Sequence, residues 1–450
     1  MIKYAFELSE KLQEPVLFRT TTRINHSSGI VTLGDIAPVK MSGDFIKDPF
    51  SYVTVPAVSR NLHVKLLKHW DEAKSISENS PYNLIEGDGP CGIVCNGISY
   101  NYVSDAVKDL ECEKKVKILR IGFSNPMPEA LVKTFLKGCD KVLVVEEGEP
   151  YMEEAVKAFA QEEGSTITIK GKSPSHFSRL YEFSPALVRK VLADYLTLAY
   201  EPPAIPDMSD VPEIPQRPPN LCAGCSHRAT FYIAKQAAAG METIIPTDIG
   251  CYTLGLLPPM SMADFVICMG SSVTTSCGFS KATNKKVISF IGDSTFFHSG
   301  IPGLINAVFN NHNFTLFILD NGTTAMTGHQ PNPGVDMTLL NQTGFGRVDI
   351  EDVVRAVGVK EVTVIQPFKL KKSIEAVKKA FEFKGVSVVI SREMCTLYAK
   401  SLKLLKGKRY RVSDKCKNHR DCINLLGCPA FFLNEGKVQI NPAQCTGCAV

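Results

Sequence analysis

Two side chains that could bind a metal ion follow two apolar segments of the chain. Asp293 comes soon after the segment Lys286–Ile291, and Asn321 comes soon after Phe314–Leu319. Ligands of open α/β sheets bind at the carboxyl ends of the strands, so both side chains are expected at one edge of a sheet. A carboxylate, an amide oxygen and a nearby backbone carbonyl suit Mg²⁺, which also binds phosphates and water.

The residues beside Asp293 add a possible phosphate site. Gly292 lets the backbone approach a phosphate closely, and Ser294 can donate a hydrogen bond to it or cap the next helix. A strand followed by Gly-Asp and a helix is also typical of a simple turn in which the aspartate only caps the helix. The choice between these interpretations depends on what else in the chain matches.

Cysteines are a second group of candidate ligands. The chain has 15 of them, and at 450 residues it is too long for a small disulfide scaffold. Five fall in the last 35 residues: Cys416, Cys422, Cys428, Cys445 and Cys448. This clustering indicates metal or iron–sulfur ligation in a reducing cytoplasm, and a structural zinc site is the competing interpretation.

The spacing of the tail cysteines resembles a two-cluster ferredoxin, whose runs read C-x2-C-x2-C-x3-C-P. The pair Cys445-x2-Cys448 matches the opening of such a run, and the earlier run reads Cys416-x2-His419-x2-Cys422-x5-Cys428-Pro429. Each fourth cysteine of a two-cluster ferredoxin serves the other cluster, so Cys428 is expected to join Cys445 and Cys448. Cys416 and Cys422 would need a cysteine beyond Val450, and His419 is either a ligand or a surface histidine.

Alternating strands and helices predict an α/β fold with parallel sheets covered on both faces. The predicted strands are Pro15–Arg19, Val116–Phe123, Lys141–Val145, Thr243–Pro246, Asp264–Cys268, Lys286–Ile291, Phe314–Leu319, Val386–Ile390 and Lys437–Ile440. A helix is expected over residues 2–13. Residues 201–220 carry seven prolines, which predicts an extended linker between domains.

Composition places the chain among ordinary globular proteins. Hydrophobic residues make up 44% and charged residues 21% of the chain, and the formal net charge of +4 gives no general argument for nucleic acid. No apolar run approaches the length of a transmembrane helix, and the N-terminus lacks the apolar segment of a signal peptide. A cytoplasmic protein without a membrane partner is therefore expected.

The stretch GDSTFFHSGIPGLINAVFNNHNFTLFILDNGTTAMTGHQPNPG, residues 292–334, resembles the thiamine-binding half of 2-oxoacid:ferredoxin oxidoreductases of the indolepyruvate type. The resemblance implies that Asp293, Asn321 and the carbonyl of Thr323 bind Mg²⁺. It also implies that Gly292 and Ser294 lie against the diphosphate of thiamine diphosphate. Cofactor contacts are further implied at Gly250, Cys251 and Gly270.

A further cysteine set carries the same resemblance. Cys222 and Cys225 form a C-x-x-C pair, Cys251 follows in DIGCY, and Cys395 follows the last apolar strand in SREMC. Their order is similar to the ligands of the [4Fe–4S] cluster beside the cofactor in the wider 2-oxoacid oxidoreductase family. Ordinary buried cysteines are the alternative, since cysteine is common in protein cores.

The resemblance also divides the chain into domains. Residues 1–57, with VLFRTTTRINHSSG, resemble the end of a pyrimidine-binding domain, and residues 58–200 resemble a transketolase C-terminal-like domain. The linker 201–220, a diphosphate- and Mg²⁺-binding domain at 221–404 and a partial two-cluster ferredoxin-like domain at 405–450 follow. The chain is thus expected to be the alpha, thiamine-diphosphate subunit of an indolepyruvate:ferredoxin oxidoreductase, truncated at both ends.

The family implies oxidative decarboxylation of arylpyruvates in an anaerobic setting. Electrons would pass through [4Fe–4S] clusters to ferredoxin, coenzyme A would take the acyl group, and a smaller beta subunit would complete a heterodimer or heterotetramer. The catalytic residue stays unknown because the family places the activating glutamate on the missing N-terminal part, so the 450-residue chain alone is expected to be inactive. A non-oxidative thiamine-diphosphate decarboxylase or carboligase, and a non-catalytic iron–sulfur or zinc module, are the alternatives.

Overall fold

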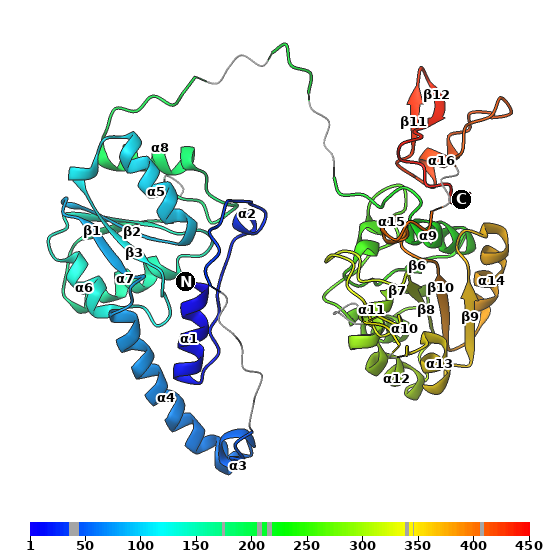
Figure 1. The fold of residues 1–450 in the computed structure, drawn as a ribbon, viewed down its shortest axis with the longest axis horizontal. Helices are drawn as coiled ribbons and strands as arrows, with labels where there is room; N and C mark the ends of the chain where they lie inside the picture. The colour runs from blue at the N-terminus through cyan, green and yellow to red at the C-terminus, as the bar shows by residue number, and fades with distance from the viewer. Residues whose placement is uncertain are drawn as a thin grey trace. The chain divides into compact units, whose positions relative to one another are not determined.

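The computed structural model describes residues 1–35, 45–172, 176–204, 209–213, 218–337, 342–344, 346–405 and 409–450. The chain divides into two compact units, Met1–Pro212 and Glu213–Val450 (Figure 1). The division falls inside the predicted linker 201–220, of which residues 205–208 and 214–217 lie outside the described residues. Each unit is built around its own five-stranded sheet.

The sheet of the first unit has the strand order β1-β3-β2-β4-β5. Its strands are β1 (Leu84–Gly87), β2 (Cys91–Asn96), β3 (Val116–Ile121), β4 (Lys141–Val145) and β5 (Thr168–Lys170). All neighbours are parallel except β1, which runs antiparallel to β3. The predicted strands at 116–123 and 141–145 are therefore confirmed as β3 and β4.

Helices cover both faces of this first sheet. Neighbouring residues of a central strand point to opposite faces, so they pack against different helices. Ile93 of β2 faces a core with α5 (Gly97–Asp109) and α8 (Pro185–Leu196), whereas Val94 faces a core with α6 (Glu129–Leu136) and α7 (Tyr151–Glu162). A short 3₁₀ helix, Glu113–Lys115, precedes β3. Both faces of the sheet are thus buried.

The N-terminal residues pack on the first unit through helices. The helices are α1 (Ile2–Leu12), α2 (Thr22–Asn25), α3 (Pro49–Tyr52) and α4 (Pro56–Glu78). Leu8 and Leu12 of α1 bury against Ala73 of α4, which confirms the expected N-terminal helix. The predicted strand Pro15–Arg19 is wrong: the segment is extended but unpaired, and Leu17 is 97% exposed. An apolar segment of this length forms a strand only where a sheet edge can receive it.

The sheet of the second unit is entirely parallel, in the order β6-β7-β8-β10-β9. Its strands are β6 (Thr243–Ile244), β7 (Lys286–Gly292), β8 (Phe314–Asp320), β9 (Glu361–Ile365) and β10 (Val386–Arg392). The parallel α/β fold expected from the sequence is confirmed. The predicted strand Asp264–Cys268 is wrong, since only Phe265 makes a single bridge, to Pro246.

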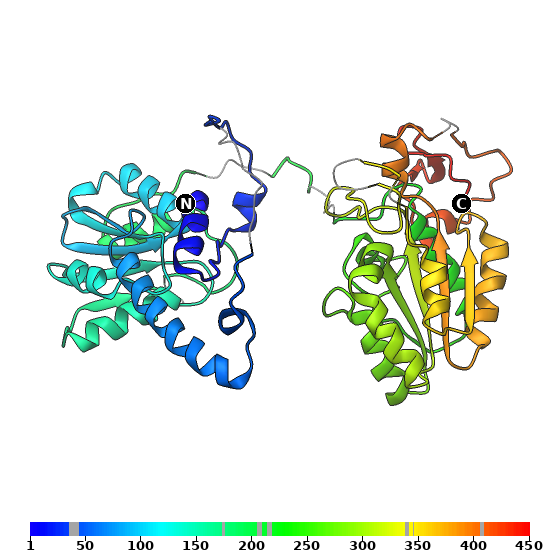
Figure 2. The same ribbon diagram turned by 60° about the horizontal axis from the view of Figure 1, so that its bottom comes forward.

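Two layers of helices enclose this second sheet (Figure 2). One face packs on α9 (Ser226–Ala237) and α14 (Leu370–Glu382), with the stacked rings of Phe290 and Phe317 in its core. The opposite face packs on α10 (Ser271–Ala282), α12 (Ile301–Phe309) and α13 (Ile350–Ala356). A 3₁₀ helix (Cys251–Leu256), α11 (Asp293–Thr295), a π turn (Phe296–Gly300) and α15 (Thr396–Ser401) surround the carboxyl ends of the strands.

The tail beyond residue 409 forms a small separate layer on the second unit. It holds α16 (Asp421–Asn424) and an antiparallel hairpin of β11 (Phe431–Asn434) and β12 (Lys437–Ile440), which confirms the strand predicted at 437–440. Within the described ranges, no helix combines the length and apolar character that a membrane crossing requires.

Candidate functional site

The carboxyl ends of β7 and β8 bring Asp293 and Asn321 together, as the strand pattern predicted. The two strands are parallel neighbours, and Gly292 lies opposite Leu319. Asp293 is 3% exposed and Asn321 is 6% exposed. The Oδ2 atom of Asp293 accepts a hydrogen bond from the backbone N–H of Gly322, the residue next to Asn321, at 2.9 Å.

The Asp293 carboxylate has the properties of a cation ligand. Its Oδ1 atom accepts from the N–H of Ser294 at 2.7 Å. Burial raises the pKa of Asp293 to about 6, because the two backbone donors only partly offset the loss of water. A divalent cation beside it would restore the ionised form, so this buried carboxylate, bound to the backbone next to Asn321, fits Mg²⁺.

The side chain of Asn321 is oriented by His227, a residue for which the sequence predicted no role. The Asn321 Nδ2 atom lies 3.2 Å from Nε2 of His227, and its Oδ1 atom accepts from the N–H of Thr323 at 3.2 Å. Complete burial lowers the pKa of His227 to about 4, so the ring is neutral and its Nε2 can accept. Its place two residues after the C-x-x-C pair was the only sequence signal.

The predicted glycine contacts lie around this same edge of the sheet. Gly270 has a φ of +87°, in the left-handed region that favours glycine, and it begins α10. A Cβ on Gly292 would come within 2.7 Å of the Tyr252 ring, and Gly250 faces the same ring. The absence of side chains on Gly250 and Gly292 is therefore required by Tyr252 alone, whatever else binds there.

Asp248 is a second buried carboxylate that the sequence reasoning passed over. It is fully buried and accepts from the N–H of Ser272 at 3.2 Å and from the hydroxyl of the same residue. Burial raises the pKa of this carboxyl. The contacts place Asp248 at the first turn of α10, where it satisfies backbone donors of the helix.

Four cysteines of the second unit, here called the body cysteine set, line one cavity of about 90 Å³. They are Cys222, Cys225, Cys251 and Cys395, and His227 and Asn321 line the same cavity. The N–H of Cys395 donates to the carbonyl of Asn321 at 3.0 Å, which ties this cavity to the end of β8. The structure thus gathers the cysteines that the sequence grouped, next to the expected Mg²⁺ ligands.

Three cysteines of the tail, here called the tail cysteine set, line a second cavity of about 230 Å³. They are Cys428, Cys445 and Cys448, the three that the ferredoxin spacing predicted to come together. Cys225 of the body set lines this cavity as well. Cys416 and Cys422 line neither cavity, and His419 is exposed.

Both cysteine sets have the donors of an iron–sulfur site but not the arrangement of a single-ion site. Among the described residues, no three Cys, His, Asp or Glu side chains converge as they would on one metal ion. A [4Fe–4S] cluster binds each thiolate at a different corner, so its ligands stand further apart than those of one zinc ion. Thiolate donors on the wall of one cavity are the ligand type that such a cluster uses.

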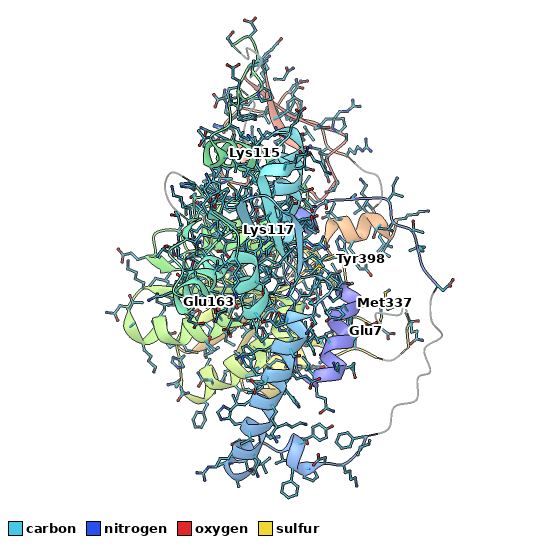
Figure 3. The ribbon with its side chains drawn as sticks, turned by 90° about the vertical axis from the view of Figure 1, so that its left-hand side faces the viewer. Glu7, Lys115, Lys117, Glu163, Met337 and Tyr398 are labelled. Atoms are coloured by element: carbon cyan, nitrogen blue, oxygen red, sulfur yellow. The ribbon has the colours of Figure 1, made fainter. Side chains whose placement is uncertain are left out.

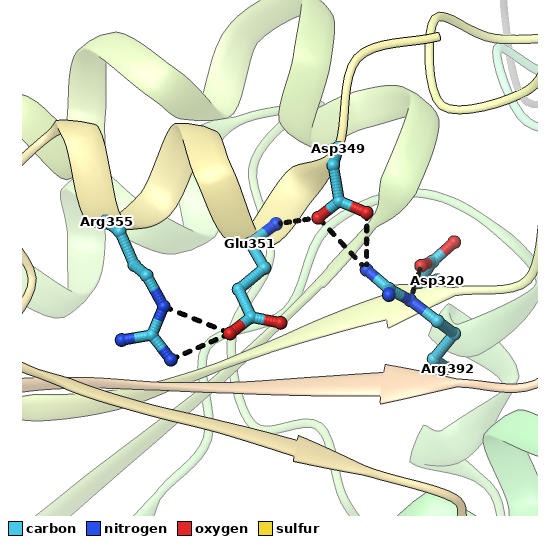
Figure 4. A network of polar contacts seen from close by, with 5 residues as sticks. All are labelled: Asp320, Asp349, Glu351, Arg355 and Arg392. Atoms are coloured by element: carbon cyan, nitrogen blue, oxygen red, sulfur yellow. Dashed lines mark hydrogen bonds and ion pairs between the residues drawn. The ribbon is translucent and has the colours of Figure 1, made fainter.

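The same strand ends carry an ion-pair network with a structural role (Figure 4). Arg392, at the end of β10, binds Asp320 at the end of β8 with 2.7 Å between Nε and Oδ2. Its Nη2 atom lies 3.4 Å from both carboxylate oxygens of Asp349, which caps α13. The network locks two neighbouring strand ends and a helix start beside the candidate site.

An aromatic contact next to the cavity of the body cysteine set holds the loop that follows Asn321. His329 stacks on Tyr398 of α15, with 5.7 Å between ring centroids and 12° between ring planes. Tyr398 is labelled in Figure 3. His329 also lines the cavity of the body cysteine set. The backbone of Thr324 pairs with Gln330, which closes the loop.

Comparison with known proteins identifies the class of the second unit. The family described as "Thiamine pyrophosphate enzyme, C-terminal TPP binding domain" matches residues 248–391, which span β7, β8, Asp293 and Asn321. A solved 2-oxoglutarate:ferredoxin oxidoreductase from Magnetococcus marinus is 21% identical over 40% of this chain and 66% of that chain, with a TM-score of 0.37. The match of residues 248–391 to this family model places a thiamine-pyrophosphate-binding domain in the second unit.

Relatives along the entire chain narrow this class to one family. Proteins named "Indolepyruvate oxidoreductase subunit IorA" from Methanothermobacter thermautotrophicus, Thermococcus kodakarensis and Archaeoglobus fulgidus are 44%, 40% and 37% identical to it. Each match covers all of this chain and 72–73% of the relative. The chain belongs to the family of indolepyruvate oxidoreductase subunit IorA, and it is part of an oxidoreductase.

Proposed function

We propose that the chain binds Mg²⁺–thiamine diphosphate and carries out the oxidative decarboxylation of arylpyruvates, with indolepyruvate as the preferred member. The observation that carries the proposal is that the Asp293–Asn321 pair lies next to the body cysteine set. Asn321 precedes Gly322, which donates to Asp293, and it lines the cavity of the body cysteine set. A cofactor held by the pair would lie beside a one-electron acceptor. The names of the relatives support the arylpyruvate substrate.

In this proposal the residues at the strand ends hold the cofactor. The side-chain oxygens of Asp293 and Asn321 and the carbonyl of Thr323 bind Mg²⁺, while His227 keeps the amide of Asn321 turned by accepting from its Nδ2 atom. Gly250, Cys251, Gly270, Gly292 and Ser294 border the cofactor. Thiamine diphosphate, when bound, supplies the electron sink for decarboxylation. The buried walls exclude water from the reacting carbon.

The cysteines carry the oxidative half of the proposal. The body set would hold one [4Fe–4S] cluster, and the tail set would supply three ligands of a second one. Cys416 and Cys422 would contribute to a further cluster. Clusters held there would supply one-electron transfer toward ferredoxin, and coenzyme A would take the acyl group. The relatives are named as subunits, which supports a partner subunit in the active assembly.

The test uses the chain with its natural ends, produced anaerobically together with its partner subunit. Reduction of a low-potential dye is measured with indolepyruvate, phenylpyruvate and pyruvate, each with and without coenzyme A and Mg²⁺–thiamine diphosphate. We expect coenzyme-A-dependent reduction with the two arylpyruvates and at least about tenfold lower kcat/KM with pyruvate, since a small substrate forfeits the binding energy of the aromatic side chain.

Two outcomes would contradict the proposal in different ways. Carbon dioxide release without reduced dye would indicate a non-oxidative decarboxylase and would leave the cysteines a structural role. No binding of thiamine diphosphate at all would indicate an iron–sulfur or zinc module in which Asp293 and Asn321 serve only the turn.

A further inference from the structure

Arg228 is a buried arginine that connects the body of the second unit to its tail. It lies in the first turn of α9 and is 3% exposed. Its Nη1 atom donates to the carbonyl of Leu426 at 3.1 Å. Its Nη2 atom donates to Oδ1 of Asn220 at 3.0 Å and to the carbonyl of Leu221. One guanidinium thus holds the segment before α9 and the tail together.

The partners of this guanidinium are neutral, which is unusual for a buried cation. Among the described residues, no carboxylate forms an ion pair with Arg228. Burial lowers its pKa, and the neighbouring side chains that oppose this shift are Cys225, Cys428 and Cys222. A buried charge is retained where an opposite charge faces it, and a cluster held by these cysteines would supply that negative charge.

The position of Arg228 relates it to both cysteine sets. It lines the tail cavity together with Cys428, Cys445 and Cys448. It follows Cys225 by three residues, and Cys225 lines both cavities. Arg228 itself lines only the tail cavity, but Asn220 and Leu221, which accept from its Nη2 atom, line the cavity of the body set, so its hydrogen bonds reach both walls.

The tail packs closely on the body around Arg228. A Cβ on Gly427 would come within 2.4 Å of Pro259 and within 3.3 Å of Nη1 of Arg228. A Cβ on Gly224 would overlap the side chain of Thr446, and the hydroxyl of Thr396 donates to the carbonyl of Gly224. Glycines at these two contacts allow the backbones to approach, so the hydrogen bond to Leu426 lies inside a close-packed contact.

We propose that Arg228 is a positioning residue that fixes the tail on the body and places a fixed positive charge between the two cysteine sets, where it raises the reduction potential of the clusters they hold. This inference rests on the proposed iron–sulfur function. Each cluster gains one electron and no proton when it is reduced, so its negative charge increases by one. A nearby cation favours the reduced form, and charge around a cluster sets its potential.

The test is a redox titration of the holoenzyme with its partner subunit, followed by electron paramagnetic resonance of the reduced clusters. Arg228→Gln removes the charge, and we expect the equilibrium constant for reduction of at least one cluster to fall tenfold or more, about 59 mV for a one-electron couple. Arg228→Lys retains the charge and should keep potentials near those of the wild type.

Lys235→Gln is the matched control on the same helix. The Lys235 amine also donates to two backbone carbonyls, those of Pro259 and Met260, at 2.7 and 3.0 Å. It lines neither cavity, so the variant loses comparable hydrogen bonds to backbone carbonyls while the charge near the cysteine sets stays the same. We expect unchanged cluster potentials in this variant.

A second readout follows the tail without relying on clusters. Limited proteolysis of the metal-free full chain should release the tail several-fold faster in Arg228→Gln and Arg228→Lys than in Lys235→Gln. Loaded clusters with unshifted potentials in Arg228→Gln would overturn the electrostatic inference and leave the proposed function standing. Wild-type protein without iron–sulfur signals would overturn both the clusters and the electrostatic inference. Equal cleavage in all variants would overturn the positioning role.

Discussion

Both units of the molecule end a central strand with a buried acidic residue, and they use it differently. Glu146 follows β4 in the first unit and Asp293 follows β7 in the second, and each is 3% exposed. The two oxygens of Glu146 accept from the N–H groups of Met152 and Glu153 at 2.8 and 2.9 Å, so they cap α7. Asp293 instead reaches Gly322 on the loop of the neighbouring strand.

The difference shows that burial of a strand-end acid does not by itself mark a site. Burial raises the pKa of both carboxyl groups. The charge of Lys172 lowers the pKa of Glu146, and both its oxygens serve one helix. Among the groups that shift the pKa of Asp293 there is no lysine or arginine, and its Oδ2 atom accepts from Gly322, the neighbour of Asn321. The bond to a second strand-end loop and the missing counter-charge together distinguish the candidate cation site.

At their opposite ends, β4 of the first unit and β7 of the second unit each begin with a lysine that makes the same two contacts. Lys141, at the start of β4, donates to the carbonyl of Tyr195 and lies 4.4 Å from the centre of its ring. Lys286, at the start of β7, donates to the carbonyl of Phe381 at 2.8 Å and lies 5.3 Å from its ring. Each cation lies at the carboxyl end of a helix, where it stabilises unpaired carbonyls.

The largest effect is expected at Asp293. Asp293→Ala removes the carboxylate ligand, and we expect Mg²⁺-dependent affinity for thiamine diphosphate to fall on the order of 100-fold or more. Isothermal titration calorimetry of the full chain with thiamine diphosphate and MgCl₂ measures this loss. Glu146→Ala is the control and should bind as the wild type does. Equal affinity of the two variants would erase the distinction between the two acids.

The second effect is the loss of stability in Glu146→Ala. The change leaves the N–H groups of Met152 and Glu153 buried without their acceptor, so we expect about 2–4 kcal/mol lower stability of the first unit. Urea unfolding, followed by a probe in that unit, measures it. A loss below about 0.5 kcal/mol would show that water replaces the carboxylate and that the cap is dispensable.

A third, smaller effect concerns the ion pairs at the strand ends of the second unit. Arg392→Ala exposes Asp320 and Asp349 to each other without the cation between them, and we expect about 1–3 kcal/mol lower stability. Arg355→Ala breaks only an i,i+4 pair with Glu351 on the surface and should cost about 0.3–0.5 kcal/mol. Denaturant unfolding of both variants compares them, and equal losses would contradict a special role of the network.

The smallest effect is a pH dependence at Lys286. Burial lowers its pKa to about 8, while the unfolded chain keeps the usual value near 10.4. The unfolded state therefore binds more protons between pH 8 and 10, so stability should gain from Lys286 as the pH rises through this range. We expect Lys286→Met to lack this gain, so its Tm should change less than that of the wild type between pH 7 and 10. Parallel pH profiles of the two proteins would refute it.

Local pattern was sufficient for the central strands and for the residues at their ends. Lys286–Ile291 and Phe314–Leu319 are continuous apolar runs because both faces of a central parallel strand are buried, and each was found within a residue of its observed end. The edge strand Glu361–Ile365 was missed, since it is mostly half-exposed and lacks such a run. Asp264–Cys268 shows the converse error: it is apolar, yet Ile267 is 65% exposed.

By itself the sequence determined the fold class, the strand ends that carry Asp293 and Asn321, and, by spacing, the grouping of the tail cysteines. The body set was grouped through its resemblance to the 2-oxoacid oxidoreductase family. Only the tertiary structure decided which distant groups meet: His227 with Asn321, and Arg228 with the tail at Leu426. The physical reason is that periodicity encodes burial and local turns, whereas partners far apart in the chain depend on strand order. The insertion of β10 between β8 and β9, which brings Cys395 to Asn321, is visible only in the folded chain.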